Sequence, residues 1–180
     1  MTLRLLISLL VIQQSTAFAV KRTGAGVSLS SIRVEQSGEV PSVLVTLEFR
    51  GGESGVAIPY CGTAKDGERL LCLEAAHLQR RVGGQWHPVL LRRTLGVLGG
   101  TPRTGIVAIE AHGTQLLTFL FSRRFFEVEP GEQLRLVVDA WPDEGSVPEQ
   151  FDIGKSGHVA GMRFETATFR CPAVPWKMVP

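Results

Sequence analysis

The sequence predicts an all-β fold of two packed antiparallel sheets, a β-sandwich of about seven strands. Apolar residues recur mainly with a period of two, turn signals fall at intervals of about ten residues, and no segment forms a convincing amphipathic helix. No internal repeat and no linker divides the 180 residues. We therefore expect a single domain after the N-terminal segment.

The N-terminus has the pattern of a cleaved secretory signal peptide. Arg4 gives a short positive region, residues 5–12 (LLISLLVI) are purely apolar, and Ala17-Phe18-Ala19 supplies small residues at a cleavage site. As a helix the apolar run spans only about 12 Å, against about 30 Å of hydrocarbon core. We expect residues 1–19 to be removed and residues 20–180 to form a secreted or periplasmic domain without a membrane span. The alternative is a buried N-terminal strand.

The strands follow in order along the mature chain. Alternation is clearest in residues 42–49, 115–121 and 133–141, where every second side chain is apolar. Weaker strand candidates are residues 27–35, 56–61, 106–111 and 161–171. Glycine, proline and polar residues mark turns between them, at 51–52, 83–84, 112–114 and 129–132.

Residues 68–81 are the one segment that could pass for a helix, since Leu71, Ala75 and Leu78 recur at intervals of four and three. The segment runs straight into Gly83-Gly84, and residues 85–91 then complete a hairpin. The hairpin reading is favoured over the helix.

Side-chain parity selects a register for this hairpin. A three-residue loop, 83–85, pairs Val82 with Trp86 and Leu78 with Leu90, so that four apolar side chains share one face. A two-residue loop would split this set. The predicted register places His87 opposite Arg81, and His77 about 13 Å further along, too far to share a metal ion.

Three cysteines in an exported chain are disulfide candidates before they are metal ligands. Cys61 and Cys72 enclose ten residues (GTAKDGERLL) with an Asp-Gly pair that turns back readily, so we favour this pairing. Cys171 is then either a free thiol or the true partner of one of the others.

Composition and charge exclude several functions. The chain has 19 Lys and Arg residues and 17 Asp and Glu residues, which gives a formal net charge of +2. The electrostatic field of so small a charge is too weak to hold a phosphate backbone. Nucleic acid is not an expected partner. The chain has no asparagine, which removes N-glycosylation and any Cys-His-Asn arrangement.

Motifs for catalysis are absent or weak. No histidine precedes Ser54, so Gly52-Glu53-Ser54-Gly55 is interpreted as a polar loop, and no metal or cofactor signature appears. The one local group of acids is Asp143, Glu144, Glu149 and Asp152. Arginine pairs at 80–81, 92–93 and 123–124 are interpreted as protection of strand edges.

Residues 94–105 (TLGVLGGTPRTG) form a glycine-rich loop that also carries Leu95, Val97, Leu98 and Arg103. A loop that only meets water does not need such apolar residues. Either they form a short edge strand on the sheet or they make an adhesive tip for a protein partner. Both explanations stay open.

Residues 107–141 (VAIEAHGTQLLTFLFSRRFFEVEPGEQLRLVVDAW) resemble the strand-turn-strand run of immunoglobulin-like and fibronectin type III-like domains of secreted bacterial proteins. In both, a Pro-Gly turn leads into a strand that ends near an aromatic residue. The resemblance implies an immunoglobulin-like sandwich and names no activity.

These observations favour a non-catalytic binding or structural module that contacts a protein or a cell-envelope component through loops at one end of the sandwich. A protease inhibitor is one concrete version, because a disulfide-closed loop such as 61–72 can present a rigid segment. The alternative is a small secreted hydrolase that combines the acidic 142–152 loop with His112 or His158. No cofactor is expected in either case.

Overall fold

The computed structural model describes residues 24–35, 41–64, 66–90, 104–122, 125–149 and 162–173. These residues form eleven β-strands and one 3-10 turn, η1 (Glu144–Ser146), which confirms the all-β, two-sheet prediction. None of the helices in these ranges is long and apolar enough to cross a membrane. The predicted signal peptide and the predicted Leu95, Val97, Leu98 and Arg103 loop lie outside the described residues.

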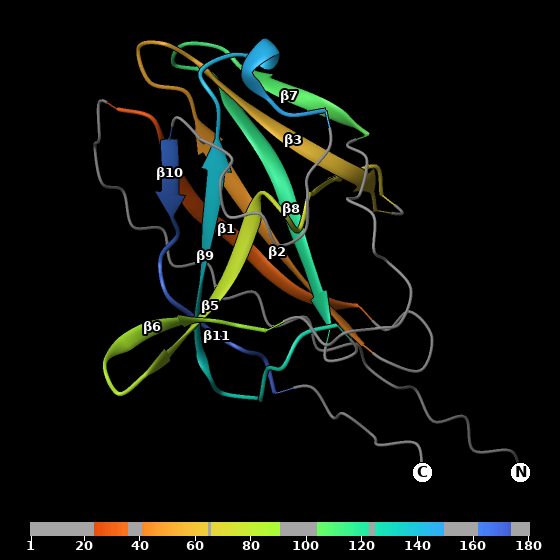
Figure 1. Cartoon of the computed structure of the whole chain (residues 1–180). Helices are drawn as coiled ribbons and strands as arrows, with labels where there is room; N and C mark the ends of the chain where they lie inside the picture. The colour runs from red at the N-terminus through yellow and green to blue at the C-terminus, as the bar shows by residue number, and fades with distance from the viewer. Residues whose placement is uncertain are drawn as a thin grey trace, which may run out of the picture.

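The first sheet, sheet A, has six strands (Figure 1). Their order is β1 (Gly26–Glu35), β2 (Ser42–Arg50), β8 (Thr114–Ser122), β4 (Arg69–Leu71), β3 (Val56–Thr63) and β7 (Gly105–Ile109). All neighbours are antiparallel except β4 and β8, which run parallel and pair only at Leu70 and Thr118.

The second sheet, sheet B, has five strands. Their order is β10 (Met162–Glu165), β9 (Gln133–Ala140), β5 (Ala76–Val82) and β6 (Gln85–Pro88), with β11 (Phe169–Arg170) also paired to β9. The predicted strand 161–171 is interrupted at Thr166, whose hydroxyl accepts the N–H of Leu136 at 2.9 Å. A break of this kind divides one predicted strand into two, so the structure has eleven strands where about seven were expected.

The core forms where the inward faces of the two sheets meet. Val43, Val45, Leu47 and Phe49 of β2 are fully buried, as the period of two predicts. They belong to one cluster with Leu117, Phe119 and Phe121 of β8 and with Leu134, Leu136 and Val138 of β9. Burial of these side chains is the main driving force for this packing.

The sheets also meet at one corner. Ala57 of β3 exchanges two backbone hydrogen bonds with Trp141, at 2.8 and 3.0 Å, just past the end of β9. Trp141 is buried in a smaller cluster with Cys72, against which Cys61 packs. The predicted disulfide is confirmed: Cys61 and Cys72 are bonded, and both cysteines belong to the β3–β4 side of sheet A. Cys171 is a buried cysteine of the main core.

Residues 68–81 form no helix. They contribute β4, a turn at residues 73–75 and the start of β5, so the favoured hairpin reading is confirmed.

The predicted register of this hairpin is wrong. Val82 pairs with Gln85 and Arg81 with Trp86, so the loop has two residues, Gly83 and Gly84. Both glycines have positive φ, 58° and 86°, which a type I′ turn requires and which suits the twist of the two strands.

The preference of the two glycines for a type I′ turn outweighs the grouping of apolar side chains on one face, which had favoured the three-residue loop. Leu78 is buried, but Val82 and Leu90 remain exposed by 54% and 60%, and His87 lies opposite Arg80 and not Arg81.

Candidate functional site: an acidic hollow on sheet A

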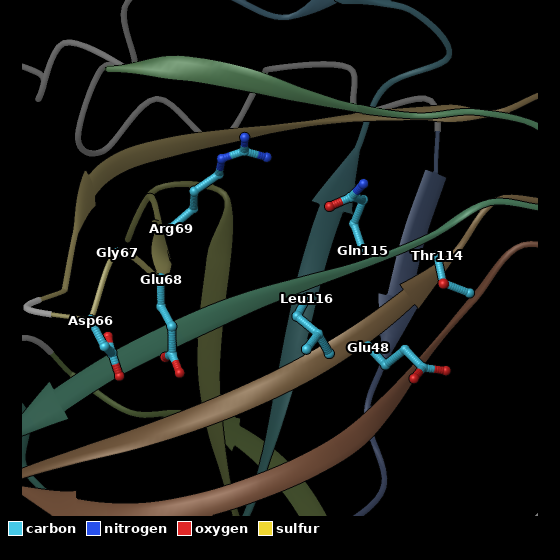
Figure 2. A pocket seen from close by; sticks show the side chains of 8 residues that line it. All are labelled: Glu48, Asp66, Gly67, Glu68, Arg69, Thr114, Gln115 and Leu116. Carbon is cyan, nitrogen blue, oxygen red and sulfur yellow. The ribbon is translucent and has the colours of Figure 1, made fainter.

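An open hollow of about 610 Å³ lies on the outer face of sheet A (Figure 2). Its lining comes from three places: β2, the start of β8, and the loop closed by the disulfide. The lining residues are Glu48, Asp66, Gly67, Glu68, Arg69, Thr114, Gln115 and Leu116. Leu116 is 56% exposed and pairs across the strands with Glu48, so an apolar side chain stands beside a carboxylate.

The disulfide loop brings its acids to the rim of this hollow. After Cys61 the chain turns back at Gly67, whose φ of +84° suits glycine, and the Asp-Gly turn expected from the sequence is present. The backbone N–H of Ala64 donates to Glu68 O at 2.8 Å, and Gly67 donates to Ala64 O at 3.0 Å. Asp66 and Glu68 therefore leave the turn in a fixed arrangement.

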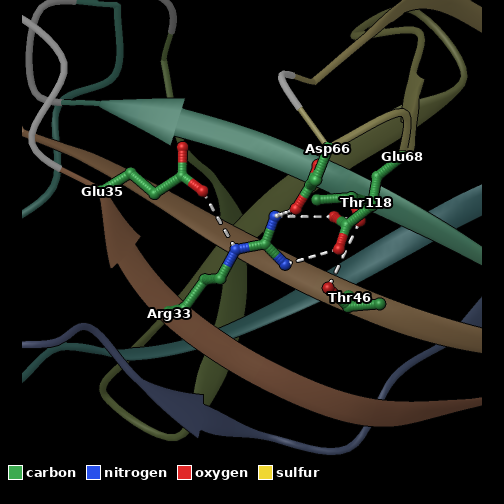
Figure 3. Close-up of polar contacts among 6 residues, drawn as sticks. All are labelled: Arg33, Glu35, Thr46, Asp66, Glu68 and Thr118. Carbon is green, nitrogen blue, oxygen red and sulfur yellow. Dashed lines mark hydrogen bonds and ion pairs between the residues drawn. The ribbon is translucent and has the colours of Figure 1, made fainter. Parts of the chain in front are cut away.

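Arg33, on the edge strand β1, holds this loop against the sheet (Figure 3). Its Nη1 and Nη2 donate to the two carboxylate oxygens of Glu68 at 2.7 and 2.8 Å. Nη2 also donates to Asp66 at 3.0 Å, and Nε donates to Glu35 at 3.2 Å. The paired geometry with Glu68 is the strong, orientation-specific form of the arginine–carboxylate bond.

Two threonines lie beneath this ion pair. Thr118 of β8 donates its hydroxyl proton to Glu68 Oε2 at 2.6 Å. The proton of Thr118 is then used, so the 3.3 Å contact with Thr46 must be a bond that Thr46 donates. Both side chains are buried, although they belong to the outer face of the sheet, because the loop and Arg33 cover them.

The electrostatics of the hollow are acidic. The hydrogen bonds from Arg33 lower the pKa of Glu68 below its ordinary value, against a smaller opposing effect of burial. The same bond with Glu68 raises the pKa of Arg33, so the pair stays charged. Arg69 lies with its guanidinium 5.7 Å from the ring centre of Tyr60. Among the residues that line the hollow, the carboxylates of Glu48, Asp66 and Glu68 outnumber the guanidinium of Arg69.

A second polar network lies on the outer face of sheet B. Asp139 accepts hydrogen bonds from Arg163 at 2.9 Å and shares one with His77 at 3.1 Å. Burial raises the pKa of Asp139, but these bonds outweigh it and the net shift is downward. Through these contacts Asp139 of β9 joins His77 of β5 and Arg163 of β10. We interpret the network as a strand-to-strand link.

Among the acids of the hydrolase alternative, Asp143 has a local structural role. Asp143 caps η1, accepting the backbone N–H and the hydroxyl of Ser146 at 2.9 and 3.0 Å. His112 occupies a tight turn with φ of 60°. Asp152 and His158 lie outside the described residues.

One group of potential metal ligands is already engaged. The ligand atoms of Cys61, Cys72 and Glu74 lie within 4.8 Å of one another. The two sulfur atoms are bonded to each other, so they offer no thiolates to a metal ion.

Sequence reasoning singled out the disulfide loop but missed Arg33, Glu48 and Thr118. The two cysteines that flank Asp66 and Glu68 in the sequence were the feature that pointed to this site. Arg33 gave none, because its partner Glu68 lies 35 residues away, in the loop that leads into β4, a strand that is not a neighbour of β1. Comparison of the chain with protein-family models, with curated proteins and with solved structures finds no match.

Proposed function

We propose that the protein is an exported, non-catalytic binding module that recognises a basic segment of a protein partner at the acidic hollow. The observation that carries this proposal is the way Arg33 and the disulfide fix the Asp66–Glu68 loop before any partner arrives. A cell-envelope protein and a free protein are both compatible with this chemistry.

Preorganisation is the first argument. Ordering a loop during association costs free energy, which weakens binding. Here the loop ends are joined by a disulfide, and the loop tip is held by Arg33 and Thr118. The cost of ordering this loop is therefore met during folding, as in a rigid inhibitor loop.

Charge complementarity is the second argument. Arg33 satisfies most of the hydrogen-bonding capacity of Glu68, but Asp66 is 53% exposed and Glu48 has no ion-pair partner among the described residues. One carboxylate without an ion pair and one that stays half-exposed in its pair, on either side of an exposed leucine, suit a lysine or arginine flanked by apolar groups. A partner of this kind would cover Leu116 and neutralise the rim.

The proposal also includes a secreted or periplasmic location and an immunoglobulin-like fold. A disulfide is expected in an oxidising compartment, which supports a secreted or periplasmic location. The two sheets, antiparallel except for the single β4–β8 pairing, support the immunoglobulin-like resemblance as an analogy of fold. The disulfide lies within sheet A, whereas antibody domains place theirs between the sheets.

The test uses a defined probe and a charge-matched control. A peptide of alternating lysine and valine is titrated into the purified protein, into a Glu48→Gln/Asp66→Asn variant, and into a Glu127→Gln/Glu144→Gln variant. Both variants lose two negative charges, but Glu127 and Glu144 are exposed carboxylates that do not line the hollow. We expect the hollow variant to bind at least about tenfold more weakly and the control to bind like the parent. Equal weakening in both variants would show only a general charge effect and would reject the site.

A further inference from the structure

A hairpin of the chain itself has the chemistry that the hollow selects. Figure 1 shows the β5–β6 hairpin extending away from the other strands of sheet B. Near its tip Arg81 is exposed, and the apolar Val82 is 54% exposed. The turn that follows, Gly83-Gly84, has no side chains to shield these two residues. The hairpin therefore presents an arginine next to an apolar residue in a fixed, extended backbone.

Arg81 is also available for a partner. Its side chain has no ion pair among the residues that the structure describes, whereas its neighbour Arg80 pairs with Glu132 at 3.5 Å. Three further arginines are held by carboxylates, namely Arg33, Arg135 and Arg163. Arg170 of sheet B donates to a backbone carbonyl. Arg81 is thus a cation that can gain a carboxylate without losing one.

Charge is divided along the sequence in the same way. Residues 75–109 contain five arginines and no aspartate or glutamate, whereas residues 34–74 contain seven acidic and three basic residues. The first segment includes the β5–β6 hairpin. The second includes β2 and the disulfide loop, which supply the carboxylates of the hollow. Two copies of the chain can therefore present complementary charges to each other.

We infer that the basic segment recognised by the hollow is the β5–β6 hairpin of a second copy of this chain. This inference rests on the proposed function and names the partner. The hollow lies on the outer face of sheet A and the hairpin belongs to sheet B, with the core between the sheets, so the contact joins two molecules. Because it joins two different surfaces it is heterologous, and it repeats from copy to copy as a ring or an open chain.

The tip of the hairpin matches the lining of the hollow. Consecutive residues of a strand direct their side chains to opposite faces, so Arg81 and Val82 make different contacts at once. The guanidinium of Arg81 neutralises Glu48 or the half-exposed Asp66. Val82 covers Leu116, which is 56% exposed and lies between these two acids (Figure 2). Burial of the two apolar side chains adds to the ionic attraction.

The cation of the lining does not oppose this contact. Figure 2 shows the side chain of Arg69 directed away from Glu48 and toward β3. There its guanidinium lies 5.7 Å from the ring centre of Tyr60. The side of the hollow next to Glu48 is therefore left to the arginine of the second copy.

The test is complementation between two variants that each lose one half of the contact. The hollow variant is Glu48→Gln/Asp66→Asn. The hairpin variant is Arg81→Gln/Val82→Ser, which changes two exposed residues and keeps the glycine turn. Sedimentation velocity at low salt measures the mass of the parent, of each variant and of their mixture.

We expect the parent to associate more as its concentration rises, and less in high salt, which screens the charges. Each variant alone should associate at least about tenfold more weakly than the parent. Their mixture should form a heterodimer and no larger species, because only one intact hairpin and one intact hollow remain. The Glu127→Gln/Glu144→Gln variant should associate like the parent.

The outcomes separate this inference from the proposed function. If the parent stays monomeric at its highest soluble concentration while the lysine–valine peptide still binds at the hollow, the inference is rejected and the proposed function stands. Association that persists in the hollow variant alone, or a mixture that forms no heterodimer, also rejects the inference. If neither the peptide nor a second copy binds at the hollow, both proposals fail.

Discussion

Arg33 and Glu68 form a two-point pair between the edge strand β1 and the disulfide loop, with nitrogen-to-oxygen distances of 2.7 and 2.8 Å. In the strand order of sheet A, β2 and β8 lie between β1 and β4, so the pair reaches across two strands. It thereby covers Thr46 and Thr118, which explains why polar side chains on an outer face are 5% and 1% exposed. The pair fixes the sheet and the rim of the hollow together.

Glu68→Gln should lower the free energy of unfolding by about 1 kcal/mol, because it removes a partly buried charge pair but keeps an acceptor for Thr118. The matched control is Glu165→Gln, which removes the pairing of Arg135 with a 53% exposed carboxylate and should cost less, about 0.5 kcal/mol. Urea denaturation of both variants measures the difference. An equal cost for both substitutions would show that Glu68 has no special role.

Acid should destabilise the protein through the same carboxylate. The pKa of Glu68 is lower in the folded protein than its ordinary value of 4.5, so the unfolded chain binds more protons in this range. The stabilisation is complete above pH 4.5 and is lost as the pH falls through the lowered pKa; Asp139 acts in the same direction. Unfolding free energies measured from pH 7 to pH 3 should fall less steeply in Glu68→Gln. Parallel curves would contradict this assignment.

Gly51→Ala should cost more than about 2 kcal/mol, because a methyl group there would collide with the backbone carbonyl of Glu110. Gly26→Ala is the control, since no atom lies within 4 Å of the added carbon. Both substitutions change the entropy of the unfolded chain equally. The difference between their melting temperatures in thermal denaturation therefore reports the collision at residue 51. Similar melting temperatures would mean that β2 and the 110–113 turn are further apart than described.

Two related substitutions in the hairpin turn should have different effects on stability. Gly83→Asn should be nearly neutral, because asparagine tolerates a φ of 58° in a type I′ turn. Gly84→Val should cost about 1–2 kcal/mol, because a branched residue at a φ of 86° is strained in open space. Thermal denaturation compares them, and a harmless Gly84→Val would favour the three-residue loop.

Strict alternation made most of the fold predictable. The segments 42–49, 115–121 and 133–141 became β2, β8 and β9 because one face of each strand is buried against the opposite sheet. The hairpin register was not predictable from parity. At the tip of an edge hairpin little apolar burial is at stake, and the backbone preference of two glycines decides the pairing.

The site was less predictable than the fold. A ten-residue loop between two cysteines indicates a rigid segment, and this part of the site was expected. The anchor was not, because Arg33 and Glu68 meet only through a strand order in which β4 inserts beside β8. No local pattern records such a long-range pairing.

Nuclear magnetic resonance of the protein during titration with the lysine–valine peptide tests the central claim most directly. We predict that amide shifts concentrate at Asp66, Gly67 and Arg69 and at residues 114–116, and that they vanish in Glu48→Gln/Asp66→Asn. Shifts confined to the outer face of sheet B, or shifts that persist unchanged in that variant, would contradict recognition at the acidic hollow.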